Sequence, residues 1–456
     1  MPDLNGDGFA DIIVGSPTAA RGGRIAGGVA TVYFGRLSGI GTTPARVLED
    51  APAGARFGWS VASAGDINGD GYADLMVGAP TSSPGGRRSA GSVWIYLGGV
   101  DGIGSRPALV IEGQAPGDEL GKSISSAGDV NADGYADLIL GAPSAAPGGE
   151  RLAGSASVFL GSGRGILGPP ITVIDGTIGT QTGFSVSGAG DVNGDGYSDI
   201  VVGAPYASPG GRRGAGVASV FLGSAAGIGP TASAVIEGPA AGDTVGFSVA
   251  NVGDMNGDGF AEVIAGAPFA SPGGRSRAGM AFVYNGSERG IGLRAIGTIN
   301  GVTEGDQLGW SVAAAGDLNG DGYADTLAGS PFVSPGGRLE AGAVSVYLGG
   351  TGGLAASPSR VIEGFASPDH LGQSTFLAGD TNGDTFDDLL IGAPHAFPAG
   401  RGYAGTASIF HGGPRGIGSS PFIVLEGERE GDNLGHSVAA YLPGRTRVST
   451  LVRVYL

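Results

Sequence analysis

A nine-residue pattern close to D-x-N-x-D-G-x-x-D recurs seven times and restricts what this chain can fold into. Its first aspartates are 62 or 63 residues apart, so seven units of that length account for nearly all of the 456 residues. Such a period is typical of repeat architectures, in which each unit packs against its neighbours. The loops begin at Asp3, Asp66, Asp129, Asp191, Asp254, Asp317 and Asp380.

Each unit contains four short segments with strand character. In the second unit these are residues 57–66, 73–80, 92–99 and 108–113, which alternate or are rich in β-branched and aromatic residues. The connections are too short for crossover helices, so the strands are expected to be antiparallel. The pattern predicts an all-β fold, a seven-bladed β-propeller of four-stranded antiparallel blades. A parallel β-solenoid is the alternative, although its coils are usually shorter than this period.

The two ends of the chain predict how the ring closes. The first unit lacks a first strand, whereas residues 434–440 form an additional first strand after the last unit. Pairing this C-terminal strand with the N-terminal unit removes open sheet edges. We expect one propeller over residues 1–442 and a divergent tail over 443–456. The expected blades lie at about 57–113, 120–176, 183–238, 246–301, 309–364 and 372–427, with a closing blade at 434–442 plus 2–50.

The repeated loop has the ligand chemistry of a calcium site. Calcium prefers roughly six to eight oxygen ligands, which side chains at positions 1, 3, 5 and 9 and the carbonyl at position 7 can supply. Position 12 is apolar, as at Val77, so the loop is not an EF-hand. Glycine at position 6 permits the sharp turn, and magnesium fits poorly because it requires strict octahedral geometry. We expect up to seven structural calcium ions.

The predicted ligands follow the same five positions in every loop. They are Asp3, Asn5, Asp7, Phe9 and Asp11; Asp66, Asn68, Asp70, Tyr72 and Asp74; Asp129, Asn131, Asp133, Tyr135 and Asp137; Asp191, Asn193, Asp195, Tyr197 and Asp199; Asp254, Asn256, Asp258, Phe260 and Glu262; Asp317, Asn319, Asp321, Tyr323 and Asp325; and Asp380, Asn382, Asp384, Phe386 and Asp388. Three carboxylates in each of seven loops make 21 of the 42 acidic residues, and seven calcium ions would change the net charge from −17 to about −3.

Ordinary turn formation is the alternative explanation for these loops. Asp, Asn and Gly favour turns, which would explain a single copy, but seven copies in one register favour a metal site. Two loops deviate from the pattern. Glu262 replaces the aspartate at position 9 of the fifth loop, which a longer side chain tolerates. Thr385 replaces glycine in the seventh loop, and since a β-branched residue at positive φ is costly, we expect that site to be the weakest.

The order of these motifs resembles the FG-GAP repeats of the integrin α-subunit β-propeller. "FG" is literal at Phe57-Gly58. "GAP" or "GSP" begins at Gly15, Gly78, Gly141, Gly203, Gly266, Gly329 and Gly392. The resemblance implies calcium in the loops between strands one and two, on the face opposite the ligand-binding one, and a role in extracellular adhesion or ligand recognition. Similar propellers occur in fungal lectins and as accessory domains of secreted enzymes, so a lectin-like module, such a domain and a regular scaffold are alternatives.

Strand direction places two other loop types on the face opposite the calcium loops. This face carries one arginine per unit: Arg24, Arg87, Arg151, Arg212, Arg275, Arg338 and Arg401. It also carries the acids Asp118, Asp243, Asp306, Asp369 and Asp432. We expect the two sets to pair across adjacent loops as a solvated rim. The alternative is an anion or carbohydrate surface, which Tyr206, Phe269, Phe332 and His395 would assist.

Composition and missing motifs exclude several classes of function. The net charge of −17 argues against a nucleic-acid partner, and no apolar run approaches the length of a membrane span. No signal peptide is present, so a secreted or cell-surface protein is represented here by its mature part. The histidines, His370, His395, His411 and His436, occupy four different repeat positions and are interpreted as incidental. The chain is predicted to be a monomer that binds a protein or glycan ligand and is not an enzyme.

Overall fold

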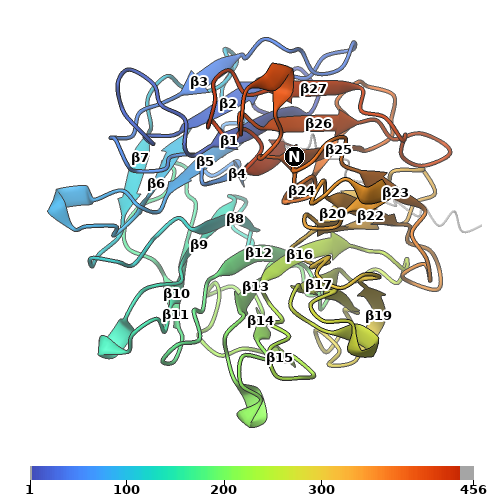
Figure 1. Ribbon diagram of the computed structural model, residues 1–456. Coiled ribbons are helices and arrows are strands. Elements are labelled where there is room, and N and C mark those ends of the chain that lie inside the picture. Colours follow the sequence, from blue (N-terminus) through green and yellow to red (C-terminus); the bar gives the residue numbers. More distant parts are fainter. Residues whose placement is uncertain (1–2, 442–456) are drawn as a thin grey trace, which may run out of the picture.

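Seven four-stranded antiparallel sheets form a ring in the computed structural model, which describes residues 3–441 (Figure 1). Blade 1 contains β28, β1, β2 and β3, and blades 2 to 7 follow in chain order from β4–β7 to β24–β27. The predicted fold class, an all-β seven-bladed propeller, is confirmed. The predicted tail at residues 443–456 lies outside the described residues.

The first and second strands of each blade lie nearest the axis of the ring. The first strands are β4 (Ser60–Gly65), β8 (Ser123–Gly128), β12 (Ser185–Gly190), β16 (Ser248–Gly253), β20 (Ser311–Gly316), β24 (Ser374–Gly379) and β28 (Ser437–Tyr441). The second strands are β1 (Asp11–Ser16), β5 (Asp74–Ala79), β9 (Asp137–Ala142), β13 (Asp199–Ala204), β17 (Glu262–Ala267), β21 (Asp325–Ser330) and β25 (Asp388–Ala393). Every residue of the second strands is buried, which explains their continuous apolar sequence.

The third and fourth strands form the outer part of each blade. The third strands are β2 (Val29–Tyr33), β6 (Ser92–Tyr96), β10 (Ser155–Phe159), β14 (Val217–Phe221), β18 (Met280–Tyr284), β22 (Ala343–Tyr347) and β26 (Thr406–Phe410). The fourth strands are β3 (Arg46–Leu48), β7 (Leu109–Glu112), β11 (Thr172–Asp175), β15 (Ala234–Glu237), β19 (Ala295–Asn300), β23 (Arg360–Glu363) and β27 (Ile423–Glu426).

Short 3-10 turns connect the second and third strands in blades 2 to 7. They are η1 (Pro84–Gly86), η2 (Pro147–Gly149), η3 (Pro209–Gly211), η4 (Pro272–Gly274), η5 (Pro335–Gly337) and η6 (Pro398–Gly400). Among residues 3–441 there is no helix with the length and apolar character that a membrane span requires.

The ring closes as the sequence predicted. β28 pairs antiparallel with β1, and in this register Val438 lies opposite Val14 and Ala440 opposite Ile12. Blade 1 therefore combines the last described strand with the first three. This pairing gives β1 a partner on both sides, so blade 1 has four strands like every other blade.

The hydrophobic core is divided among the seven interfaces between neighbouring blades. Between blades 1 and 2, for example, Ile13 and Val32 pack with Phe57 and Leu75, all of them at most 2% exposed. Equivalent clusters join each of the other neighbouring pairs. Each blade is therefore stabilised through its neighbours, as expected of a repeat protein.

The FG and GAP motifs mark the closest approach between blades. A Cβ atom on Gly78 of the GAP motif would lie 2.2 Å from the carbonyl oxygen of Gly121, the FG-position glycine of the next blade. The Ser60 hydroxyl donates a hydrogen bond to that same carbonyl, at 2.7 Å. Only glycine fits at the GAP position, because a side chain would separate the two backbones.

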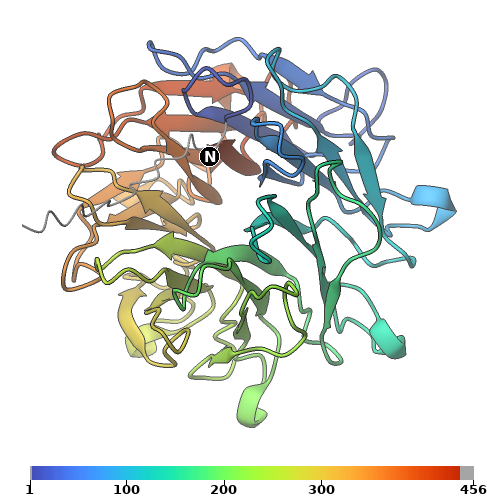
Figure 2. The same ribbon diagram turned by 180° about the vertical axis from the view of Figure 1, so that it is seen from behind.

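Figures 1 and 2 show the two faces of the ring. One face, here called the loop face, carries the turns from first to second strands, where the repeated aspartate loops lie. The other, here called the FG face, carries the FG motifs at the start of the first strands and the turns from second to third strands. Candidate metal ligands and candidate ligand-binding side chains are thus on opposite faces.

Candidate metal centre and ligand-binding face

The carboxylate at position 9 of each loop starts the second strand and is completely buried. In blade 2, Asp74 is 0% exposed and accepts hydrogen bonds from the backbone N–H groups of Ile67, at 3.0 Å, and Gly98, at 2.9 Å. Ile67 lies in the same loop, whereas Gly98 follows the third strand. This carboxylate therefore fastens the loop to the end of the third strand, in addition to the ligand role predicted from the sequence.

The other predicted ligands organise the loop around themselves. Asp66 at position 1 accepts hydrogen bonds from the backbone N–H groups of Gly69 and Gly71, at 2.6 and 2.9 Å. Asn68 accepts one from the N–H of Asp70, and Asp70 accepts one from that of Tyr72. The loop backbone thus curls around oxygen atoms that belong to positions 1, 3 and 5.

The predicted ligands lie in one loop without forming a closed cage. Within the described part of the chain, no three acidic or histidine side chains converge closely enough to hold a metal ion. Their oxygens instead accept backbone N–H groups. The calcium sites, including all five positions in each loop, therefore stay a prediction.

The electrostatics of position 9 nevertheless favour a cation. Burial, followed by the neighbouring carboxylates of Asp70 and Asp66, raises the pKa of Asp74 from 3.8 to about 7. Burial also raises the pKa of Asp11 to about 8 and that of Glu262 to about 7. A carboxyl group in such surroundings is costly to ionise, and a nearby cation would remove that cost.

Glu262 supplies a second observation that fits a cation. This side chain is fully buried, and its Oε1 atom has no hydrogen-bond partner. A buried carboxylate oxygen without a partner is unfavourable unless something positive lies beside it. Together with carboxylate, amide and carbonyl oxygens at the other positions, this donor set fits a hard divalent ion such as calcium.

Two positions of the loop, 4 and 6, adopt left-handed backbone conformations. At position 6 Gly71 has φ 91°, and Thr385 has φ 81°, which confirms that a β-branched residue is held at positive φ in the seventh loop. At position 4 Gly69 has φ 74°, a requirement that the spacing of the aspartates did not predict. A Cβ atom there would lie 2.7 Å from the ring of Tyr135, so position 4 accommodates the position-7 aromatic ring of the next blade.

Hydrogen bonds join the seven loops into a closed ring. The carbonyl of Asp66 at position 1 accepts a hydrogen bond from the N–H of Ala136, at position 8 of the next loop, with a length of 2.9 Å. The same bond recurs between every pair of neighbouring blades, including Asp380 to Ala10 at 3.3 Å across the junction of the chain ends. The state of one loop can therefore affect the next.

Large aromatic side chains lie near the axis on the FG face in four of the seven blades. They occupy the position after the FG glycine: ring centroids of Phe247 lie 4.9 Å from Phe184 and 4.8 Å from Trp310. Trp59 is the member of this series in blade 2. The ammonium group of Lys122, which occupies the same position in blade 3, lies 4.8 Å from the centroid of the Trp59 ring. All are partly exposed. In the sequence, these residues could have been recognised by the recurrence of large side chains directly after the "FG" motif.

The aromatic residues predicted from the sequence form a second row beside this series. Tyr206, Phe269 and Phe332 each meet a ring of the first row edge-on, at centroid distances of 6.1, 5.9 and 5.2 Å. The structure therefore brings the predicted aromatic residues together on one face. We refer to the residues after the FG glycines in blades 2, 4, 5 and 6 as the axial aromatic cluster; they are Trp59, Phe184, Phe247 and Trp310.

The arginine rim is paired differently from the prediction. Arg87 binds Glu112 of its own blade at 2.9 Å, not an aspartate of an adjacent loop. Arg212, Arg338 and Arg401 pair in the same way with Glu237, Glu363 and Glu426, at 2.6 to 2.7 Å.

The remaining rim residues also depart from the expected pairing. In blade 3 Glu150, rather than Arg151, occupies the equivalent position. The aspartates instead brace their own turns, as where Asp118 accepts the N–H of Ala115 at 2.8 Å. Local geometry within each blade satisfies both groups, so charges need not pair across loops.

Three histidines interpreted as incidental lie together on the FG face. His370 and His395 have ring centroids 4.2 Å apart, and Nε2 of His370 lies 3.2 Å from a carboxylate oxygen of Glu340. The ring of His436 lies against that of Trp59, with centroids 4.4 Å apart and an angle of 50° between the planes, and burial lowers the pKa of His436 to about 4. Different repeat positions from blades 6, 7 and 1 thus meet in space, which the one-dimensional pattern concealed. His411 lies on the loop face.

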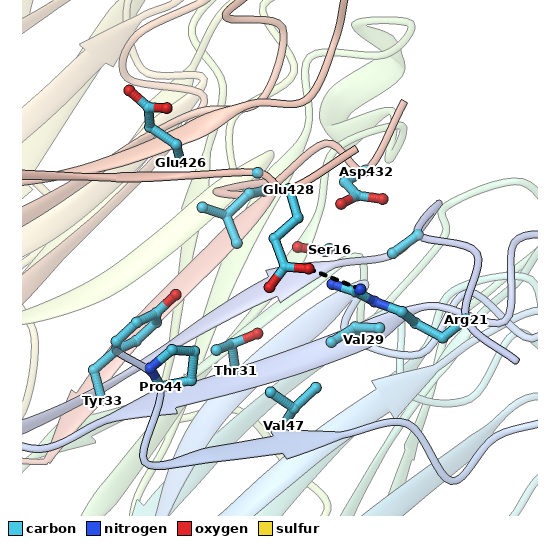
Figure 3. Close-up of a pocket in the computed structure, with 13 residues that line it drawn as sticks. Ser16, Arg21, Val29, Thr31, Tyr33, Pro44, Val47, Glu426, Glu428 and Asp432 are labelled. Atoms are coloured by element: carbon cyan, nitrogen blue, oxygen red, sulfur yellow. Dashed lines mark ion pairs between the residues drawn. The ribbon is translucent and has the colours of Figure 1, made fainter. Parts of the chain in front are cut away.

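A small cavity lies at the junction of blades 7 and 1 (Figure 3). Its volume is about 30 Å³, and Arg21 and Glu428 form an ion pair of 2.8 Å at its edge. A space of that size holds about one water molecule. It is therefore too small to be a ligand pocket, and we look for ligand binding on the open FG face.

Two groups of curated proteins are similar to this chain. Integrin alpha-5 of Xenopus laevis is 34% identical over 211 residues, which is 44% of this chain and 19% of that protein. Phosphatidylinositol-glycan-specific phospholipase D of Bos taurus is 37% identical over 183 residues, 37% of this chain and 21% of that protein. The matches therefore span about a fifth of each relative's length.

The prediction that the chain is not an enzyme is contradicted by these comparisons. One relative is a phospholipase, and the structure is also similar to the periplasmic gluconolactonase of Pseudomonas aeruginosa. That likeness has a TM-score of 0.52 with 13% identity, covers 92% of this chain and 96% of the other, and shows a shared fold. Missing catalytic motifs in a regular repeat therefore do not exclude an enzyme, and the comparisons do not show that the chain is one.

The family model described as FG-GAP repeat matches seven segments. They are residues 2–31, 57–96, 121–159, 182–221, 245–284, 308–347 and 373–410. The segments cover more than half of the chain. In blades 2 to 7 they coincide with the inner three strands and the loop, and in blade 1 they cover the loop, β1 and the start of β2. Together with the seven-bladed fold, this match shows that the chain belongs to the FG-GAP repeat family and has an integrin-α-like propeller.

Proposed function

We propose that this chain is a calcium-stabilised, extracellular propeller for adhesion or ligand recognition. The observation behind the proposal is that two kinds of site lie on opposite faces: loops with buried carboxylates on the loop face and the axial aromatic cluster on the FG face. The integrin relatives support a protein ligand. The extracellular location is part of the proposal and rests on the similarity to the integrin relatives.

Calcium would be held by the side chains at positions 1, 3, 5 and 9 and the carbonyl at position 7. When bound, it would neutralise carboxylates whose burial opposes ionisation. The loop backbone already curls around these oxygens, and the position-9 carboxylate connects the loop to the third strand. At a free calcium concentration a hundred times the dissociation constant, each site would add about 2.7 kcal/mol of stability.

We assign ligand binding to the axial aromatic cluster on the FG face. Partly exposed Trp and Phe side chains offer large apolar areas at small entropic cost and are enriched among residues that dominate binding energy. Trp310 contacts Phe247 at 4.8 Å and Phe332 at 5.2 Å, so its ring is held in place before a ligand arrives. The four rings lie near the axis, where one ligand can reach several blades.

A second candidate is a recognition module within a larger secreted enzyme or a lectin-like module. The phospholipase relatives favour the first version, and stacked aromatic rings beside polar groups suit sugars, which favours the second. Both candidates use the same face of the propeller. The identity of the bound molecule therefore separates them.

The test is an array of glycans and extracellular-matrix proteins, probed with the calcium-loaded chain and with Trp310→Ala. Loss of this anchor is expected to weaken binding about thirtyfold, corresponding to roughly 2 kcal/mol. Phe365→Ala is the matched control, since this aromatic side chain is 56% exposed on the outer rim. Binding of glycans alone would favour the lectin-like candidate. Equal binding by wild type, Trp310→Ala and Phe365→Ala would refute the axial aromatic cluster as the binding site.

A further inference from the structure

The residues that follow the FG glycines divide the centre of the FG face into two parts. In blades 4, 5 and 6 they are Phe184, Phe247 and Trp310, whereas in blades 7, 1, 2 and 3 they are Gln373, His436, Trp59 and Lys122. Lys122 is the only lysine of the chain. The seven blades therefore share a backbone at the axis but differ there in chemistry.

Two cations lie against one ring of the axial aromatic cluster. The ammonium nitrogen of Lys122 lies 4.8 Å from the centroid of the Trp59 ring, and the guanidinium carbon of Arg56 lies 5.4 Å from a ring centroid of the same side chain. Both distances are within the roughly 6 Å over which an aromatic face attracts a cation. We call Arg56, Trp59 and Lys122 the cationic patch.

The cationic patch retains hydrogen-bond donors for a ligand. Lys122 forms an ion pair of 3.4 Å with Glu119, whose carboxylate also accepts a hydrogen bond from the Ser144 hydroxyl at 3.1 Å. An ammonium group has three donors, so this pair leaves two of them unused. Arg56 is exposed and forms no ion pair with the rest of residues 3–441. Two positive charges against one negative charge leave the patch with an excess of one positive charge.

The electric field at this point is positive, although the chain as a whole carries a net charge of −17. Burial is the main cause that lowers the pKa of His436 to about 4, and the charges of Lys122 and Arg56 lower that pKa further. His436 is therefore neutral at pH 7. Its Nδ1 atom lies 3.2 Å from the carbonyl oxygen of Trp59, which helps to hold the patch in place. The acidic loops lie on the opposite face, so an anion is attracted to this part of the FG face.

Three glutamine amides flank the same rings. Gln181 and Gln307 each lie three residues before a member of the axial aromatic cluster, and Gln373 follows the FG-position glycine of blade 7. All three side chains are partly exposed, and they form no hydrogen bonds with other residues of the described part of the chain. An amide both donates and accepts hydrogen bonds, as the hydroxyl groups of a sugar require.

We propose that the FG face binds an acidic glycan, with a carboxylate or sulfate of the sugar on Lys122 and Arg56 and the sugar ring on the axial aromatic cluster. In an acidic sugar the anion is attached at a short, fixed distance from the ring, so its site needs a cation beside an aromatic face. The cationic patch has this arrangement. An acidic peptide carries its charge on a flexible side chain and has no such requirement. This inference rests on the proposed function, because it takes the FG face to be the ligand-binding face.

The experiment titrates four probes into the calcium-loaded chain by calorimetry. They are a uronic-acid trisaccharide, its uncharged methyl ester, a sulfated trisaccharide and triglutamate. The proteins are wild type, Lys122→Gln, Lys122→Arg and the matched control Arg213→Gln, which removes an exposed positive charge from the rim of the same face. Lys122→Gln should bind an acidic trisaccharide about tenfold more weakly than wild type and Arg213→Gln, because a charge-assisted hydrogen bond is lost. Lys122→Arg should retain most of the affinity, and thermal melting checks that each variant is folded.

Chemical labelling locates the bound sugar independently. Because Lys122 is the only lysine, an amine-reactive reagent reports on this one side chain when its peptide is analysed by mass spectrometry. At a probe concentration about ten times the dissociation constant, labelling of Lys122 should slow about tenfold, in proportion to the fraction of free protein. Unchanged labelling with a bound acidic trisaccharide would place the sugar elsewhere and refute the site.

Equal binding of the uronic-acid trisaccharide and its methyl ester, with no binding of the sulfated sugar, would overturn the proposal. So would absence of binding by both acidic sugars, equal affinities in wild type and Lys122→Gln, or tighter binding of triglutamate, which would assign the patch to an acidic peptide. Matrix-protein binding that depends on Trp310, without any binding of acidic sugars, would refute this inference and leave the proposed function standing. Lys122-dependent sugar binding by a chain that binds no calcium would support this inference and contradict the proposed function.

Discussion

Replacing the GAP glycine Gly78 with alanine should open the interface between blades 2 and 3. The new Cβ atom would lie 2.2 Å from the Gly121 carbonyl oxygen and 2.2 Å from the Ser60 Oγ atom, whereas real Cβ atoms essentially never come within 3.0 Å of another heavy atom. The two backbones would have to separate by roughly 1 Å. The residue is not at positive φ, so the contact alone causes the effect.

The expected cost has two parts. Overpacking costs about 1–3 kcal/mol, and loss of the hydrogen bond from Ser60 to Gly121 costs about 0.5–1.5 kcal/mol, for a total near 2–4 kcal/mol. With an unfolding entropy of about 2.1 cal/mol/K per residue, a chain of 456 residues loses roughly 1 °C in Tm per kcal/mol. Gly78→Ala should therefore melt about 2–4 °C below wild type.

The assay is thermal and urea unfolding followed by circular dichroism at a fixed calcium concentration. Gly99→Ala is the control, since the nearest atom to its new Cβ would be 3.8 Å away. Both substitutions restrict the unfolded chain equally, so the difference between them isolates the contact. Equal stability of the two variants would refute the explanation of the GAP motif.

Three further predictions concern the loops. Asp74→Asn should lower the free energy of unfolding in urea by about 1–3 kcal/mol, because an amide NH2 group would face a backbone N–H. The same variant should bind one calcium ion fewer than wild type. Unchanged stability and calcium content would contradict both roles of Asp74. Tyr135→Ala should lower the free energy of unfolding in urea by about 1–3 kcal/mol, because this partly buried ring packs on Gly69 of the preceding loop; exposed Tyr403→Ala is the control, and equal stability of the two variants would contradict the contact. Burial raises the pKa of Asp74 from 3.8 to about 7, so chelated protein should be most stable at low pH and lose stability as pH rises through about 7. Saturating calcium should abolish that loss. Tm is measured against pH with chelator and with calcium, and the difference between the two curves removes the contribution of the histidines, which is the same in both. Parallel curves would show that no cation acts at Asp74.

The architecture could be predicted from the sequence because each blade repeats one local pattern. Asp74 was expected both in the loop and at the start of a strand, and it begins β5. Ring closure followed from counting strands at the two ends. These features depend on contacts within a blade or on the period itself, both of which the order of residues records.

Features that depend on contacts between blades could not be predicted. Gly69 appeared to be an ordinary loop glycine, but its conformation and space are set by Tyr135 in the next blade. His370 and His395 occupy different repeat positions, and only the ring places their side chains 4.2 Å apart. The exclusion of an enzyme was wrong for a related reason: a regular scaffold does not reveal which chemistry the fold assembles from scattered side chains.

The central claim, that calcium in the loops stabilises the propeller, is tested most directly by thermal melting with calcium, with magnesium and with chelator. We predict a clear rise in Tm with calcium over chelator and a much smaller rise with magnesium, because each occupied site adds to the stability of the folded state. An identical melting temperature in all three conditions would contradict the claim.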